Sequence, residues 1–477
     1  MKNKNYHLGY VTFLALVAAG GGFLFGYDTA VISGTIGQVS QLYHLDVLQQ
    51  GWYVGCALIG SIVGVAFAGT LSDRLGRKPA MIVSAAMFTL SALGCALCAT
   101  FDQLVVYRII GGVGIGVASI VCPMYISEIA VTQFRGRLVS TYQLAITVGF
   151  VAAYLANFLL LQWSRGVGEG SGLWHKVMVD EVYRGMLGLE TVPALLFFIV
   201  IFMLPESPRW LILKGQDKRA KSIFSLIYRR EADAGHQVAE VADSMRREEK
   251  SDVRYLFRPG IRTALVVGVC IAVLGQFMGV NAVLYYGPKI FEDAGLSSGD
   301  SLFYQVLVGM VNMLTTVLAL CIIDKVGRKQ LVYYGVSGMI VSLLLIATYF
   351  SFGEAWHWSS VVMLVFFLLY VFFTAVSICA VVWVLLSEMY PTRVRGLAMS
   401  IAGFALWIAT YLVSQLTPWL LSTATPSGTF VIFAVMCLPY LFIMWRYIPE
   451  TTGRSLEEIE RYWLKKKTPT PTAGWRD

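Results

Sequence analysis

Twelve long apolar runs dominate this sequence and restrict it to one class of structure. An α-helix needs about 20 apolar residues to cross the hydrocarbon of a bilayer. Only 14% of the 477 residues are charged, against roughly 25% in ordinary soluble domains. We therefore predict an all-α membrane protein with twelve transmembrane helices close to residues 11–36, 51–71, 79–99, 103–124, 138–162, 186–204, 261–288, 303–323, 331–352, 361–388, 397–421 and 428–447.

The basic residues are distributed unevenly over the loops between these runs. With the first loop outside, all but five of the 37 Lys and Arg residues fall on the cytoplasmic side, which is the positive-inside pattern. We therefore expect a multi-pass protein of the cell (inner) membrane with both termini in the cytoplasm. A net charge of +8 can also indicate a basic surface for an acidic partner, but this distribution argues against nucleic acid as a partner.

The chain nearly repeats itself. LSDRLGRKPA resembles CIIDKVGRKQL, SEIAVTQFRGR resembles SEMYPTRVRGL, and PESPRW resembles PETTGR, each pair lying six apolar runs apart. Two parallel six-helix repeats are typical of transporters that bind their substrate between the halves. We predict an N-terminal six-helix bundle at 1–206, a cytoplasmic amphipathic helical linker at 207–258, a C-terminal six-helix bundle at 259–448 and a cytoplasmic tail at 449–477.

The repeated motifs place charged residues where neighbouring helices end on the cytoplasmic side. One exposed ion pair contributes only about 0–1 kcal/mol, but a network at a closing interface can favour one of two conformations. The alternative is that these residues only anchor the topology. The predicted cytoplasmic salt-bridge network consists of Asp73, Arg77, Glu128, Arg135, Glu206, Asp324, Arg328, Glu388, Arg395 and Glu450.

One carboxylate, Asp28, interrupts the first apolar run, and Arg108 is the one cation in the apolar runs of the N-terminal half. An ionised carboxylate in hydrocarbon costs at least about 2.5–3.5 kcal/mol, so it must face a cavity or a partner. We expect Asp28 and Arg108 to pair, and protonation of Asp28 to release Arg108. The alternative is a fixed salt bridge that holds two helices together.

Together these motifs resemble the sugar porter family of the major facilitator superfamily. The resemblance runs from GYDTAVISG at 26–34 to PETTGRSLEE at 449–458. It implies a monomeric symporter in the lipid bilayer that imports a monosaccharide, D-xylose first and D-glucose or another aldopyranose next, with protons as the coupling ion and no cofactor. A facilitative sugar uniporter, a membrane sugar sensor and a membrane-embedded transferase are the alternatives. The lone acid argues against a uniporter, the short tail against a sensor, and the lack of catalytic acids at a loop against an enzyme.

The resemblance also implies roles for individual residues. Asp28 and Arg108 match the family's proton-coupling pair, and Glu190 matches a second intramembrane acid. Amides suit sugar hydroxyls, and aromatic surfaces suit the face of a pyranose ring. The implied sugar contacts are Phe25, Gln143, Gln276, Asn281, Tyr286, Asn312, Trp383 and Trp407.

Four positions depart from the family pattern. Gly275, Phe150 and Leu406 stand where relatives carry Gln, and Cys379-Ala380 replaces a Gly-Pro break in the tenth run. Phe150 either shrinks the pocket toward pentoses or presents an apolar wall to the hydroxymethyl group of a hexose, and we favour the first. The histidines and cysteines have no metal-ligand spacing, so no metal site is expected.

Overall fold

The computed structural model describes residues 6–168, 170–247, 253–391, 394–451 and 456–465. Within these residues, twelve helical segments are long and apolar enough to cross a membrane, which confirms the predicted number and the all-α class. The helices are α1 (Leu8–Val31), η2 (Ile32–Gly34), α2 (Ile36–Leu42), α3 (Val47–Leu75), α4 (Arg77–Leu97), α5 (Phe101–Ile129), η3 (Thr132–Phe134), α6 (Arg135–Arg165), α7 (Leu173–His175), η4 (Lys176–Asp180), α8 (Val182–Gly188), α9 (Thr191–Ile201), α10 (Pro208–Leu213), α11 (Asp217–Ile227), α12 (Glu231–Arg247), α13 (Val253–Leu256), α14 (Ile261–Phe277), α15 (Val280–Asp293), α16 (Ser298–Val326), α17 (Arg328–Phe352), α18 (Ser360–Thr374), η5 (Ala375–Cys379), α19 (Ala380–Met389), α20 (Arg395–Thr423), α21 (Thr425–Tyr447) and α22 (Leu456–Lys465).

The spans form two groups of six with equivalent packing. In the first group α1 packs on α6, α3 on α5 and α4 on α9, and in the second α14 packs on α20, α16 on α18 and α17 on α21. The partners in each equivalent pair are six spans apart, so the packing follows the internal duplication. The halves meet where α3 contacts α20 and where α6 contacts α16, two interfaces that the same duplication relates.

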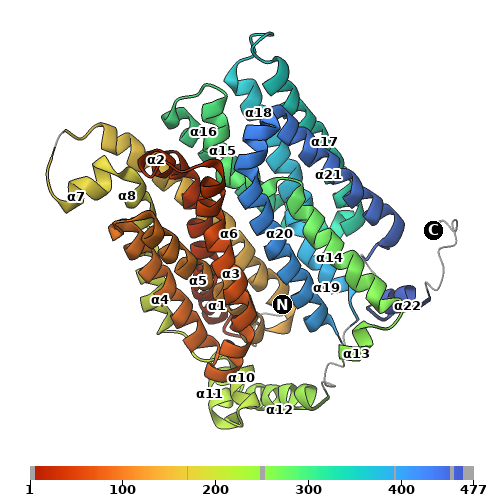
Figure 1. Cartoon of the computed structure of the whole chain (residues 1–477). Coiled ribbons are helices and arrows are strands. Elements are labelled where there is room, and N and C mark those ends of the chain that lie inside the picture. The colour runs from red at the N-terminus through yellow and green to blue at the C-terminus, as the bar shows by residue number, and fades with distance from the viewer. Residues whose placement is uncertain (1–5, 169, 248–252, 392–393, 452–455, 466–477) are drawn as a thin grey trace.

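The helices that do not cross the bundle identify its two ends. Helices α10–α13 and α22 gather at one end, here called the linker face (Figure 1). The N-terminal end of the described chain reaches this face, because Tyr6 pairs with Tyr228 beside α11. At the same face, the Tyr255 hydroxyl of α13 donates to Glu460 Oε1 of α22 at 2.5 Å. The opposite end, here called the far face, carries α2, α7 and the connection from α15 to α16.

Two spans are irregular near their middles. Span seven is interrupted between α14 and α15, and Gly279 in the interruption has φ +90°, a conformation that favours glycine. Span ten contains a π-helical turn, Ala375–Cys379, where the family pattern has its Gly-Pro break. Span ten therefore has a local irregularity even without the glycine and proline of the family pattern. Short π-helical turns of this kind frequently occur at functional sites.

The predicted charged network forms two equivalent clusters, one in each half. Arg77 Nη2 pairs with Glu128 Oε1 at 2.9 Å, and the Arg77 backbone N–H donates to Glu206 Oε1 at 2.9 Å. Equivalent contacts join Arg328 Nη2 to Glu388 Oε1 at 3.0 Å and the Arg328 backbone N–H to Glu450 Oε1 at 3.1 Å. Each of these contacts joins helices within one half, so they stabilise the halves as units.

The other members of the predicted network play smaller parts. Asp73 pairs with Arg77 at 3.1 Å, and Arg395 begins α20. In the part of the chain that the structure describes, Arg135 at the start of α6 is exposed and forms no ion pair. The side chain of Asp324 lies outside the described residues.

Candidate functional site

A cavity of about 270 Å³ lies between the two halves. Its walls come from α1, α5 and α6 on one side and from α14, α15, η5, α19 and α20 on the other. Ligand pockets commonly measure roughly 300–1,000 Å³, so this cavity suits a small ligand. Six of the eight predicted sugar contacts line it: Phe25, Gln143, Gln276, Asn281, Trp383 and Trp407.

The interruption of span seven brings two amides to one wall of the cavity. Gln276 precedes Gly279 and Asn281 follows it. Asn281 Nδ2 donates to Gln276 Oε1 at 2.8 Å, and Thr410 Oγ1 of α20 donates to the same oxygen at 3.1 Å. Because an amide oxygen has two lone pairs, both of its acceptor positions are used. The Gln276 NH₂ group is therefore oriented as the hydrogen-bond donor of this wall.

Aromatic rings from both halves form another part of the wall. The rings of Phe25 and Trp407 lie 5.8 Å apart across the interface. Trp383 is 41% exposed although it lies within a membrane-spanning helix lining the cavity. Phe150 packs edge-on against Tyr154, with ring centroids 6.0 Å apart. The cavity thus combines amide donors with flat apolar surfaces.

All four departures from the family pattern fall on this wall. Phe150, Gly275, Cys379 and Leu406 each line the cavity. The substitutions therefore change the surface that a ligand meets and leave the helix packing behind it in place. Phe150 and Leu406 put apolar carbon where the family pattern has an amide, and Gly275 removes the side chain altogether.

Two of the predicted sugar contacts, Tyr286 and Asn312, are not among the residues that line this cavity. Tyr286 is 1% exposed and donates its hydroxyl to the backbone carbonyl of Ser414 at 2.7 Å, so it packs inside the C-terminal half. Its neighbour Tyr285 lines the cavity instead, because successive residues of an α-helix point about 100° apart. Asn312 is buried in α16 and is not among the residues that line the cavity.

Sequence reasoning missed several hydroxyl-bearing residues of the wall. Thr29, Ser119, Tyr142 and Thr410 line the cavity together with Tyr285. The signal for Tyr285 was the YY pair after the amide-rich stretch, and the signal for Tyr142 was its place beside Gln143. The threonines carried little signal, because a hydroxyl in a membrane helix commonly bonds its own backbone. Thr410 does so as well as contacting Gln276.

The predicted coupling residues Asp28, Arg108 and Glu190 lie together in the N-terminal half, and each is at most 2% exposed. Arg108 Nη1 forms an ion pair with Asp28 Oδ1 and donates to the Asp28 carbonyl at 3.2 Å. Glu190, where α8 meets α9, interacts with Asp28. Arg108 is therefore paired with Asp28 and lies within electrostatic range of a second buried carboxylate, Glu190. One guanidinium and two carboxylates carry no net charge when they hold one proton. Since uncompensated buried charge is costly, that protonation state is favoured by burial.

This cluster and the cavity share helix α1. Phe25 and Thr29 line the cavity on either side of Asp28 in the chain. A change of charge at Asp28 therefore acts on the helix that forms one wall of the cavity. Within the described ranges, no three His, Cys, Asp or Glu side chains come together as metal ligands would.

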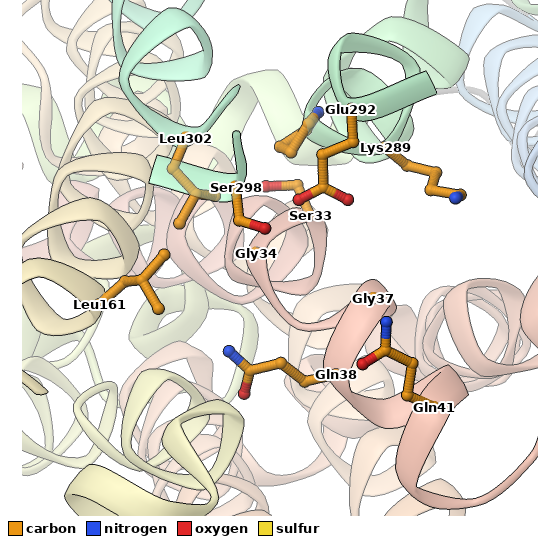
Figure 2. A pocket seen from close by; sticks show the side chains of 11 residues that line it. Ser33, Gly34, Gly37, Gln38, Gln41, Leu161, Lys289, Glu292, Ser298 and Leu302 are labelled. Carbon is orange, nitrogen blue, oxygen red and sulfur yellow. The ribbon is translucent and has the colours of Figure 1, made fainter. Parts of the chain in front are cut away.

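A second, smaller pocket lies at the far-face end of the interface, beside α2 and the connection from α15 to α16 (Figure 2). It measures about 100 Å³ and is lined by residues of both halves, among them Gln38 and Gln41 from α2 and Glu292 from α15. A water molecule occupies about 30 Å³ in the liquid, so this pocket has room for only a few waters. The halves are nearly closed at this end.

Close backbone packing and two hydrogen bonds also join the halves on the far-face side of the cavity. Gln415 Nε2 of α20 donates to the Leu48 carbonyl of α3 at 2.9 Å, and the Tyr154 hydroxyl of α6 donates to the Leu284 carbonyl of α15 at 2.8 Å. Gly51 of α3 abuts the Gln415 carbonyl and leaves no space for a side chain. The far face is therefore the closed end of the interface.

Known proteins resemble this chain over nearly its whole length. A family model described as "Sugar (and other) transporter" matches residues 14–463. The arabinose-proton symporter of Bacillus subtilis is 38% identical, with 97% of each chain covered. The D-xylose-proton symporter of Escherichia coli is 36% identical over 98% of this chain and all of that one.

A solved structure supports the same relationship. The inward open conformation of the xylose transporter XylE from E. coli matches with a TM-score of 0.81 and 34% identity, covering 95% of this chain and 100% of that one. Since both the family model and these relatives cover most of the chain, the assignment does not rest on the motifs alone. The chain belongs to the sugar transporter family, has the major facilitator fold, and is a transporter rather than an enzyme.

Proposed function

We propose that this protein is a proton-coupled symporter that imports a monosaccharide by alternating access. The observation that carries the proposal is the juxtaposition of two sites on α1. A small cavity with amide and aromatic walls lies beside a buried cluster formed by Asp28, Arg108 and Glu190. One proton makes the net charge of this cluster zero, so we assign the coupling proton to it. A uniporter has no need for such a cluster, because it moves sugar without a titrating group.

The energetic cycle follows from the charges of this cluster.

 With the cavity empty, Asp28 is ionised and paired with Arg108. A proton that enters from the outside neutralises Asp28 and releases Arg108 from it, which leaves Glu190 as the counter-ion of Arg108. Sugar binding then draws the two halves together around the amides of Gln276 and Asn281. Release of sugar and proton on the other side restores the ion pair.

We place the linker face in the cytoplasm, so the conformation described here is open toward the inside. The basic residues of the linker and tail support this orientation, as does the structural match to an inward open relative. Cysteines introduced at Ser171 and Ser244, after replacement of the exposed Cys321, provide the test. Ser171 should react with an impermeant thiol reagent from outside and Ser244 only from inside, and the reverse pattern would contradict the orientation.

For the substrate we propose an aldopyranose, with D-xylose preferred and D-glucose next. The cavity volume supports a monosaccharide over a disaccharide, and Phe150 supports a pentose because it occupies space that a hydroxymethyl group needs. Each lost hydrogen bond to a neutral hydroxyl costs about 0.5–1.5 kcal/mol, or roughly 2- to 13-fold in affinity. The missing amides at Gly275 and Leu406 should therefore weaken binding without abolishing it.

The deciding experiment is uptake of labelled D-xylose into proteoliposomes, with and without an imposed proton gradient. We expect accumulation only with the gradient, competition by other aldopyranoses, and a shift toward D-glucose in Phe150→Gln. Equal uptake with and without the gradient would identify a uniporter. Preference for a disaccharide or for a substrate that is not a sugar would contradict the site assignment.

A further inference from the structure

Tyr285 of α15 lies between the cavity and the buried ion pair. The cavity described above and a smaller one beside Arg108 share two lining residues, Thr29 and Tyr285. The Thr29 hydroxyl donates to the Phe25 carbonyl at 2.5 Å, so it is engaged within its own helix. In the part of the chain that the structure describes, the Tyr285 hydroxyl has no hydrogen-bond partner, although the residue is only 4% exposed.

The charges of Arg108 and Asp28 both act on the Tyr285 hydroxyl. On the guanidinium side, Arg108 Nε is buried and has no hydrogen-bond partner among the described residues. A phenol oxygen can accept a hydrogen bond from a guanidinium. When Asp28 is protonated its hold on Arg108 weakens, and Glu190 is the carboxylate that still acts on the guanidinium. The guanidinium then has N–H donors without acceptors, and a buried donor without an acceptor is costly. Tyr285 is positioned to supply that acceptor.

Tyr285 also belongs to the opposite half of the molecule from Arg108. Its two neighbours in the chain fix its position, since the Leu284 carbonyl accepts from Tyr154 at 2.8 Å and the Tyr286 hydroxyl donates to the Ser414 carbonyl at 2.7 Å. Movement of one half against the other therefore changes the separation of Tyr285 from Arg108. A contact between them depends on both the proton and the conformation.

We propose that Tyr285 is a positioning residue that couples occupancy of the cavity to protonation of Asp28. Its ring forms part of the cavity wall, while its hydroxyl accepts a hydrogen bond from Arg108 once Asp28 has taken up a proton. The proton goes to the Asp28 carboxylate, and no other bond is made or broken. This inference rests on the proposed proton-coupled function and assigns the residue that links its two sites.

The test compares Tyr285→Phe with Tyr286→Phe in proteoliposomes. Both substitutions remove one buried hydroxyl and keep the ring, but Tyr286 lies outside both cavities. Three quantities are measured for each protein: sugar counterflow, accumulation driven by a proton gradient, and the pH dependence of that accumulation. Counterflow requires a folded protein that binds sugar but no net proton movement.

We expect Tyr285→Phe to retain counterflow and to lose accumulation near neutral pH. A hydrogen bond to a charged group changes an equilibrium by roughly 10- to 150-fold, so the pH profile of accumulation should shift by about 1 to 2 units toward acid. Tyr286→Phe should keep the wild-type profile. An unchanged profile in Tyr285→Phe, or loss of its counterflow and accumulation together, would overturn the inference. If the wild-type protein itself does not accumulate sugar with a proton gradient, the proposed function fails first.

Discussion

The cluster of Asp28, Arg108 and Glu190 allows a quantitative test of whether two carboxylates share one counter-ion. In Asp28→Asn the guanidinium keeps Glu190 as a possible partner, and in Glu190→Gln it keeps Asp28. In the double variant it has neither. Arg108 is only 2% exposed in the wild-type structure, so water does not replace the lost carboxylates. Removing all partners of a buried charge costs about 3–5 kcal/mol.

The expected free energies of unfolding follow from this arithmetic. Each single variant should lose less than about 1.5 kcal/mol, the scale of one hydrogen bond, while the double variant should lose about 3–5 kcal/mol. The effects are therefore not additive. Adding Arg108→Met to the double variant removes the unpaired cation, and it should recover most of the lost stability because apolar replacement of a whole buried ion cluster is often neutral or stabilising.

The assay is reversible unfolding of the purified proteins in detergent at one pH, with sugar counterflow as a check that each variant is folded. If Asp28→Asn alone is as unstable as the double variant, Glu190 does not act as a second counter-ion for Arg108. If the double variant loses no more free energy of unfolding than the two single variants lose together, the three groups do not form one charge cluster. Either result would refute the account of the exchangeable proton.

Two further predictions concern the far face. Gly51→Trp should prevent α3 from approaching α20 and so abolish sugar exchange. The control is Gly69→Trp on the same helix, which should be tolerated because no neighbour lies within 4 Å of a side chain there. Equal sugar exchange by both variants would show that closure of this end is not required. The backbone carbonyl of Gly168 at 3.0 Å and the carboxylate of Asp180 at 3.2 Å face the two ring nitrogens of His175 and raise the pKa of its imidazole. A raised pKa in the folded state stabilises the segment below the ordinary value of about 6.5, and this contribution is lost as the pH rises through the folded value. Amide exchange of this segment, corrected for intrinsic rates, should thus be faster at pH 8 than at pH 6, and His175→Gln should remove the difference; a pH response that persists in the variant would assign it to another group.

The fold could be predicted from the sequence because a bilayer imposes a simple constraint. Backbone polar groups in hydrocarbon must be bonded within the helix, so each long apolar run could be assigned as a span without knowledge of its neighbours. The same constraint made Asp28 and Arg108 conspicuous, since an ionisable residue in an apolar run needs a partner. Their ion pair is present in the structure.

The residues of the cavity wall were only partly predictable. Positions such as Gln276 and Trp383 came from the family resemblance, and the structure places them on the wall. The choice between Tyr285 and Tyr286 depended on how α15 is rotated after the interruption at Gly279, and sequence periodicity does not carry across such a break. Asn312 also came from the family resemblance, but it is buried in α16 and does not line the cavity.

The sequence by itself determined the number of spans, their division into two repeats and the presence of a buried charge in the first span, because each of these depends on local composition and on the cost of placing polar groups in lipid. Only the tertiary structure decided that Glu190 joins Asp28, that the far face is the closed end, and that Tyr285 lies between the cavity and Arg108. These facts depend on how helices distant in the sequence pack together, and that packing is set by the combined shape of many side chains rather than by any one segment.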